Sequence, residues 1–324
     1  MKILVTGGSG FIGCNVVPYF QDKGWEVLNL SEVPPRDSSK KSLWRKCDIL
    51  DRTKVFAYFK EFDPDYVIHL AARTDLSGNT LTDYSVNIVG TQNVVDAVNS
   101  NPGIKRAMYA SSRLVFKIDH KPAHVLDYKP STPYGSSKIE MEKIVLAQPE
   151  DAVPWLMFRP TSIWGEWFGV PYIDFFLSVV KGRYMHPAGR KINKSFGYVG
   201  NTVFMLDKFL EAPIEDFNRK IYFASDYKPV EVFEWSTIIR TQLGLPPVKT
   251  APIWLLSAAG KVGDFAQTLG MKHAPLTSFR LANLLTNMEY DLTEEARICG
   301  PLPFSAEQGV ERTLAWMKQA KILA

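Results

Sequence analysis

A glycine-rich turn between a buried strand and a helix opens the chain. The apolar run 3–5 leads into Thr6-Gly7-Gly8-Ser9-Gly10-Phe11-Ile12-Gly13, and an amphipathic stretch from 12 to 23 ends before Gly24. Glycines let a backbone turn sharply and approach a ligand, and a helix N-terminus presents N–H groups and a positive dipole end. The turn is therefore typical of a dinucleotide pyrophosphate site, although its spacing is G-x-x-G-x-x-G instead of G-x-G-x-x-G. A plain strand-to-helix connection stays an alternative.

Runs typical of buried strands alternate with amphipathic runs through the first half of the chain. We predict strands at 3–5, 26–30, 66–70, 106–111 and 155–159, and helices at 12–23, 53–62, 87–98 and 136–146. This alternation indicates an α/β fold with a doubly wound parallel sheet of the Rossmann type. Ligands of such sheets bind at the carboxyl ends of the strands.

The pattern changes near residue 165. An aromatic, turn-rich stretch at 164–171 is followed by longer helical patterns at 230–243 and 306–319. We expect a dinucleotide-binding Rossmann domain at 1–165, with strands near 195–225, at 196–199 and 221–224, returning to its sheet. Residues 166–194 and 226–324 are then expected to form a smaller, mostly helical substrate domain, a division that suits a chain of 324 residues.

Composition narrows the possible partners. A formal charge of +4 without a Lys/Arg run longer than two favours small anionic ligands over nucleic acid. Three widely spaced cysteines predict neither a disulfide framework nor a metal site, and favour the cytoplasm. The chain opens without signal-peptide anatomy. Its longest apolar patch, 251–260, is too short to cross a bilayer, so we expect a helix packed in a core or at an interface and no membrane partner.

The end of the second strand bears on the choice of dinucleotide. A ribose-binding carboxylate is expected near there, and Ser31 occupies the place, with Glu32 next and Arg36 following. Ser31 with Arg36 would favour the 2′-phosphate of NADP, whereas Glu32 would bind the ribose hydroxyls of NAD. The sequence leaves both open.

Tyr134 and Lys138 are candidates for acid/base chemistry. Residues four apart lie on one helix face, so the ammonium can lower the pKa of the phenol and hold a nicotinamide ribose. The tyrosine can then exchange a proton with an alcohol or ketone. Ser111-Ser112 precedes this pair by 22 residues, at a predicted strand end.

These pieces together resemble the extended short-chain dehydrogenase/reductases, and among them the NAD-dependent nucleotide-sugar epimerase/dehydratase family. Further similar segments are Cys47-Asp48-Ile49, His69-Leu70-Ala71-Ala72, Asn87 with Gly90-Thr91, Ser111-Ser112-Arg113-Leu114-Val115-Phe116 and Arg159-Pro160-Thr161. Weaker likeness continues through 194–199 to 290–292, so the resemblance covers nearly the whole chain.

The resemblance implies a role for each matching residue. Ser112 would bind the sugar oxygen, Tyr134 would be the acid/base, and Lys138 would tune it. The implied cofactor-binding residues are Gly7, Gly10, Phe11, Ile12, Gly13, Ser31, Arg36, Asp48, Ile49, Leu70, Ala71, Ala72, Asn87, Tyr134, Lys138 and Pro160. The substrate-binding candidates are Arg73, Arg113, Thr161, Lys194 and Arg280. Asp48 as a helix N-cap and Asn87 as a buried core amide stay alternatives, and no metal is expected.

Departures from the family pattern narrow the chemistry. The 4,6-dehydratases have an Asp-Glu pair just after the catalytic hydroxyl, where this chain has Arg113-Leu114. The glutamate of the related decarboxylases and the cysteine of the epimerase-reductases that make GDP-fucose are missing too. The reaction left after these exclusions is oxidation or reduction of a sugar hydroxyl at C4.

The function expected from this resemblance is a nucleotide-sugar 4-epimerase that uses NAD, with NADP as an alternative. An NADP-dependent 4-ketosugar reductase would use the same residues. A 3β-hydroxysteroid-type dehydrogenase is a further alternative, because 252–256 and 279–280 faintly resemble that branch. A regulator that senses NAD(P) without catalysis is disfavoured because Ser112, Tyr134 and Lys138 are all present. Pairing of two copies through the helices that start near Asn87 and Ser136 is expected.

Overall fold

A computed structural model describes residues 1–268, 271 and 276–323 of the chain. The chain forms two compact units: the first comprises 1–167, 197–227 and 292–303, and the second comprises 168–196, 228–291 and 304–324. The sequence-based boundaries put 292–303 with the second part. In the structure this segment carries α11 (Thr293–Cys299), which packs against α6 (Val199–Glu211) of the first unit.

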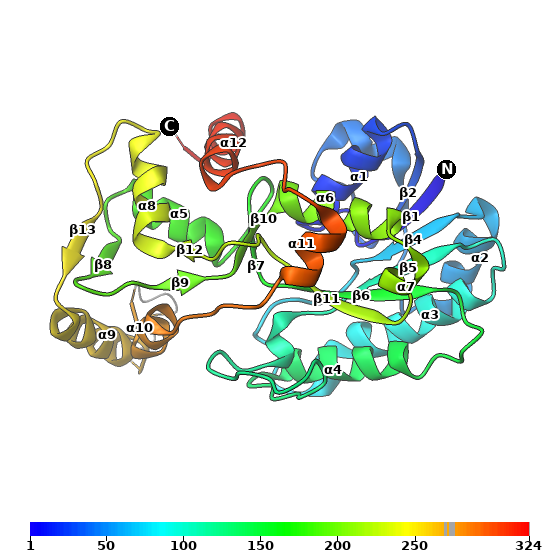
Figure 1. The fold of residues 1–324 in the computed structure, drawn as a ribbon, viewed down its shortest axis with the longest axis horizontal. Coiled ribbons are helices and arrows are strands. Elements are labelled where there is room, and N and C mark those ends of the chain that lie inside the picture. The colour runs from blue at the N-terminus through cyan, green and yellow to red at the C-terminus, as the bar shows by residue number, and fades with distance from the viewer. Residues whose placement is uncertain (269–270, 272–275, 324) are drawn as a thin grey trace. The chain divides into compact units, whose positions relative to one another are not determined.

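The first unit is built on a seven-stranded parallel sheet (Figure 1). Its order is β11-β6-β5-β4-β1-β2-β3, and every neighbouring pair is parallel. The strands are β1 (Lys2–Thr6), β2 (Glu26–Ser31), β3 (Trp44–Lys46), β4 (Tyr66–His69), β5 (Arg106–Ala110), β6 (Trp155–Pro160) and β11 (Lys220–Ala224). The predicted doubly wound fold is confirmed. The direction of winding reverses between β1 and β4, where such sheets bind ligands.

Helices cover both faces of this sheet because strand side chains alternate between the faces. Ile3 and Val5 of β1 pack in one core cluster with α1 (Gly13–Asp22) and α6, while Leu4 packs in the other with α2 (Arg52–Phe62), α3 (Thr91–Asn99) and α4 (Pro133–Leu146). Figure 1 shows α1 and α6 on one side of the sheet and α3 and α4 on the other.

Several predicted elements have shifted boundaries. The helix predicted at 136–146 begins at Pro133, because Thr132 caps it and Pro133 suits its first turn. The helix predicted at 87–98 starts as one wide π-type turn, Val86–Gly90, before α3. The strand predicted at 221–224 joins the main sheet as β11. The strand predicted at 196–199 does not, because β10 (Phe196–Tyr198) pairs with β7 (Ser162–Trp164) instead.

The second unit is mostly helical. Its helices are α5 (Tyr172–Val180), α8 (Val232–Thr241), α9 (Ile253–Thr268), α10 (Ser278–Leu285) and α12 (Ala306–Gln319). Short strands pair as β12 (Val230–Glu231) with β9 (Asn193–Lys194) and as β13 (Lys249–Ala251) with β8 (Met185–Pro187).

The first unit also holds the short helix α7 (Ile214–Phe217). Among the described residues, no helix has the length and apolar character needed to span a bilayer.

Candidate active site

The glycine turn sits at the carboxyl end of β1, and its three glycines have different surroundings. Gly7 has a φ of +72°, and a Cβ there would lie 2.5 Å from the backbone nitrogen of Ala71. A Cβ on Gly13 would lie 2.4 Å from the carbonyl oxygen of Gly7. Gly10 is exposed, and a Cβ there would meet only the Gly7 oxygen, at 3.1 Å. Gly7 and Gly13 therefore serve the fold of the turn, whereas Gly10 leaves its outer surface open.

The end of β4 lies against this turn. Leu70 N–H donates to the carbonyl oxygen of Thr6 at 2.9 Å, and Ala71 N–H donates to the Thr6 hydroxyl at 3.3 Å. Leu70, Ala71 and Ala72 are each half-buried. The structure thus brings together two predicted cofactor segments that are about sixty residues apart in the chain. Phe11 and Ile12, also half-buried, lead from the turn into α1.

The Ser31 hydroxyl is used inside the protein. It accepts a hydrogen bond from Ser9 N–H at 3.1 Å and donates to Asn29 Oδ1 at 2.8 Å, while Asn29 Nδ2 donates to the Ser9 hydroxyl. Ser31 therefore holds the glycine turn, together with Asn29, which sequence reasoning missed. Glu32, the next residue, is exposed. The exposed Arg36 donates to the Trp167 carbonyl oxygen at 2.6 Å.

Asp48 and Ile49 follow β3 and have opposite surroundings. Asp48 is exposed and accepts from Leu50 N–H at 2.9 Å, but the N-cap of α2 is Asp51, so the alternative of Asp48 as a helix cap is wrong. Ile49 is buried in the core beside Gly90, where a Cβ would lie 2.5 Å from it.

The three predicted catalytic residues come from two neighbouring elements. Ser112 follows β5, and its Oγ accepts from Leu114 N–H at 3.1 Å. Tyr134 lies in the first turn of α4, and the nearby Ser112 side chain acts on its pKa. Lys138 lies one turn later, and its Nζ donates to the Ala110 carbonyl oxygen at 2.7 Å. All three are buried.

Burial governs the charges of this trio. It raises the pKa of Tyr134 to about 12, and the Ser112 side chain offsets only part of that effect. Burial also lowers the pKa of Lys138 to about 8, against the carboxylate of Glu142, which raises it. The net pKa of the Tyr134 phenol is therefore raised because desolvation dominates, and its lowering by Lys138 stays a prediction.

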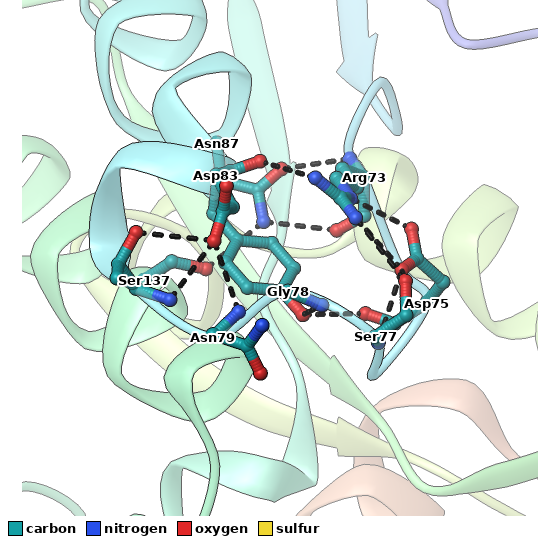
Figure 2. Close-up of polar contacts among 10 residues, drawn as sticks. Arg73, Asp75, Ser77, Gly78, Asn79, Asp83, Asn87 and Ser137 are labelled. Carbon is teal, nitrogen blue, oxygen red and sulfur yellow. Dashed lines mark hydrogen bonds and ion pairs between the residues drawn. The ribbon is translucent and has the colours of Figure 1, made fainter.

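Asn87 connects the catalytic helix to the loop after β4. Its Nδ2 donates to the Ser137 hydroxyl at 2.9 Å and to the Arg73 carbonyl oxygen at 3.0 Å, and its Oδ1 accepts from Arg73 N–H at 2.8 Å (Figure 2). Ser137 in turn donates to the Tyr134 carbonyl oxygen. This fits the support for the active-site helix that the family resemblance implies for Asn87, although Asn87 is fully buried as well.

Arg73 holds the loop at 73–84. Its guanidinium binds the Asp75 carboxylate, with Nε to Oδ2 at 2.8 Å, and also donates to the Asp83 carbonyl oxygen (Figure 2). It lies over the ring of Tyr84, 5.1 Å from the ring centre. The buried Tyr84 ring is in turn 5.9 Å from that of Tyr134. These contacts give Arg73 a structural role, and its predicted contact with substrate stays a prediction.

A buried ion pair behind the catalytic helix was missed by sequence reasoning. Arg159 and Glu142 are both fully buried and 2.6 Å apart, and Ser111 and Tyr128 donate to the same carboxylate. Burying both charges stabilises little unless the remaining hydrogen bonds are also satisfied, which they are here. The sequence did contain a signal for Glu142, because it follows Lys138 by four residues and so lies on the same face of the catalytic helix.

The remaining substrate candidates divide between the units. In the first unit, Arg113 directly follows Ser112, and its Nη1 is buried without a hydrogen-bond partner among the described residues. Thr161 N–H donates to the Ala224 carbonyl oxygen where β6, ending at Pro160, pairs with β11. In the second unit, Lys194 Nζ donates to the Asn283 and Thr286 carbonyl oxygens at the end of α10, whereas Arg280 is exposed.

Comparison with known proteins places the chain in a family. A model described as the NAD dependent epimerase/dehydratase family matches residues 3–220. The 3-beta-hydroxysteroid dehydrogenase of Mycolicibacterium neoaurum is 27% identical to this chain, and the matched region covers 97% of this chain and 91% of the dehydrogenase. The N-acetyl-alpha-D-glucosaminyl-diphospho-ditrans,octacis-undecaprenol 4-epimerase of Escherichia coli O157:H7 is 24% identical, over 97% of this chain and 95% of its own.

Among solved structures, UDP-glucose 4-epimerase from Thermotoga maritima superposes with a TM-score of 0.74 at 19% identity, covering 99% of this chain and 100% of the other. The family model spans well over half of the chain, so the predicted enzyme class and cofactor are confirmed at the level of the family. The chain belongs to the NAD-dependent epimerase/dehydratase family of extended short-chain dehydrogenase/reductases.

Proposed function

We propose that this protein is a 4-epimerase of a sugar carried on a diphosphate. The proposal rests on Ser112, Tyr134 and Lys138 lying together behind a glycine turn, with Arg113 and Leu114 where a dehydratase has acids. Without an acid or thiol at that place, the site is suited to interconverting an alcohol and a ketone.

The residues around the turn fit NAD. A pyrophosphate can approach the exposed Gly10, because that residue has no side chain in the way. Glu32 is the exposed carboxylate at the end of β2 and suits ribose hydroxyls. The Ser31 hydroxyl is engaged by Ser9 and Asn29, which favours NAD over NADP. NAD held there would supply the acceptor and donor of the hydride at C4.

The protein's own residues move the proton. Tyr134 takes the proton of the C4 hydroxyl during oxidation and returns it after the 4-keto sugar has presented its other face. Ser112 donates to the same sugar oxygen, because its Oγ already accepts from Leu114 and its O–H can point away. Lys138, held by the Ala110 carbonyl oxygen, provides a positive charge that stabilises the phenolate.

Arg113 is the observation that favours a sugar over a sterol. Its Nη1 is buried without a hydrogen-bond partner among the described residues, immediately after Ser112. A buried guanidinium N–H without a partner costs free energy that a substrate oxygen can recover. A sugar offers several oxygens around C4, whereas a sterol ring offers carbon.

Two alternatives use the same residues. A 4-ketosugar reductase would consume NADPH, which Ser31 and Arg36 would have to support. A 3β-hydroxysteroid-type dehydrogenase is favoured by the likeness to the Mycolicibacterium neoaurum relative. The carrier of the sugar diphosphate is a nucleoside or, as in the name of the Escherichia coli relative, a polyprenol.

The test is a substrate screen with a matched pair of variants. UDP-, dTDP- and GDP-sugars, a polyprenyl-diphosphate sugar and a 3β-hydroxysteroid are each incubated with the purified protein and NAD, and C4 inversion is followed by NMR. Inversion without net NADH supports the epimerase. Arg113→Leu is expected to raise KM about tenfold or more, and Arg113→Lys less, because one lost hydrogen bond to a charged group costs roughly 1.5–3 kcal/mol. Steroid oxidation with no sugar turnover would refute the proposal.

A further inference from the structure

Helix α9 carries apolar residues on its outer side as well as on the side that packs inward. The buried residues of this helix are Leu256, Gly260 and Gly263, which recur at spacings of four and three and so form one stripe. This stripe packs on α10, with which α9 lies side by side in Figure 1. Gly260 permits close contact, since a Cβ there would lie 3.2 Å from the backbone nitrogen of Ser278.

The opposite stripe of α9 is exposed but carries apolar side chains. Trp254 is 71% exposed, Val262 69% and Phe265 65%, and Ala258 completes the stripe. We call these four residues the apolar side of α9. Phe279, at the start of α10, is 73% exposed. An ordinary surface helix places charged residues on its outer side, so an outer side built from Trp and Phe indicates a surface that is covered in use.

The charge of the second unit indicates which kind of partner can cover this apolar surface. The second unit carries 14 of the 38 Lys and Arg residues and 8 of the 34 Asp and Glu, a formal charge of +6, whereas the first unit carries −2. At the apolar side itself, Lys261 is exposed between Ala258 and Val262, and Arg280 is exposed beside Phe279. The nearby acid, Asp264, is half-buried and accepts from Ser278 N–H at 3.1 Å.

We propose that the apolar side of α9, with Phe279 of α10, docks on the surface of an anionic lipid bilayer. Aromatic side chains favour the membrane interface, and helices that lie in its plane combine such a face with Lys and Arg. A second copy of this unit would bring the same positive charge against itself, which disfavours a dimer through this surface. The inference departs from the sequence-based expectation of no membrane partner, which considered only a spanning segment.

The test measures sedimentation with sucrose-loaded vesicles. The full chain is expected to bind vesicles of phosphatidylcholine with phosphatidylserine, more weakly in high salt, and to bind pure phosphatidylcholine far less. Trp254→Gln and Phe265→Gln are each expected to lower the partition coefficient about tenfold, which is about 1.4 kcal/mol. Lys261→Glu is expected to lower it as well, by reversing a charge at the anionic surface.

Ile214→Gln is the matched control, because Ile214 is an exposed apolar residue of the first unit. It is expected to bind vesicles as the unchanged protein does. Equal binding by the Trp254→Gln and control variants, or no binding to anionic vesicles, would overturn the proposal. So would a dimer in analytical ultracentrifugation that Trp254→Gln dissociates, because the covering partner would then be a second copy. Thermal unfolding of each variant shows whether it is folded.

Discussion

At the residue scale, Tyr134 carries the proton transfer of the proposed chemistry. Replacing Tyr134 with Phe keeps the ring beside Tyr84 and removes only the hydroxyl that exchanges the proton. We expect turnover to fall at least about a hundredfold, because general acid–base catalysis contributes about 10²–10⁴-fold, while NAD affinity stays the same. Tyr109→Phe is the control, since it removes another buried hydroxyl, one without a hydrogen-bond partner among the described residues. Normal turnover by Tyr134→Phe would remove it from the mechanism.

The lowered pKa of Lys138 leads to a prediction about stability, also at the residue scale. Its folded-state pKa of about 8 lies below the ordinary lysine value, so between these two values the unfolded chain holds a proton that the folded chain has lost. The free energy of unfolding contributed by this group therefore rises with pH through that window, by on the order of 3 kcal/mol in all. Lys138→Met removes the group and with it this rise.

The measurement is urea unfolding of both proteins at several pH values from 7 to about 10, the ordinary lysine range. The unchanged protein should gain stability relative to Lys138→Met as the pH increases. Parallel stability curves for the two proteins would mean that the buried ammonium does not titrate in this range.

At the scale of elements, the glycine turn contains glycines that the fold requires and one glycine that leaves room for the ligand. Gly13→Ala would place a methyl group 2.4 Å from the Gly7 carbonyl oxygen, so we expect it to destabilise the protein by about 1–3 kcal/mol. Gly10→Ala meets only the Gly7 oxygen, at 3.1 Å, and should lower the melting temperature much less than Gly13→Ala, yet weaken NAD binding by blocking the pyrophosphate. The check is the melting temperature with and without NAD. A full NAD-induced shift in Gly10→Ala would show that the pyrophosphate does not approach there.

Sequence patterns predicted those elements whose signal is local. The strands of the sheet's centre were predictable because each is a short apolar run, and the catalytic helix because Tyr134 and Lys138 share a face. Pairings between distant segments were not predictable: the Lys194 ammonium holds the end of α10, 89 residues away, while its predicted contact with a diphosphate stays a prediction. Arg73 likewise holds a loop whose shape no local pattern encodes. Cationic side chains bind backbone carbonyl oxygens as well as they bind ligands, so sequence alone does not separate the two roles.

At the scale of the whole molecule, the first unit carries the candidate catalytic residues, and the second carries an apolar surface and most of the net positive charge. A nucleotide sugar diffuses freely in water, so an enzyme for it gains nothing from a bilayer. A sugar on a polyprenyl diphosphate stays in the bilayer, and an enzyme docked there meets it at a much higher effective concentration. The two proposals, although independent, together favour the lipid carrier.

This combination predicts a difference between two substrates of the same enzyme. With a polyprenyl-diphosphate sugar in anionic vesicles, the double change Trp254→Gln and Phe265→Gln should lower kcat/KM about tenfold or more, because the protein loses two exposed aromatic groups that insert into the bilayer on docking. With the same sugar on a soluble diphosphate carrier, kcat/KM should be unchanged, because neither residue belongs to the candidate active site. Both rates are measured by C4 inversion, with Ile214→Gln as the control. Equal losses on the two substrates would mean that the changes damage the enzyme itself, and equal retention would mean that docking does not deliver the substrate.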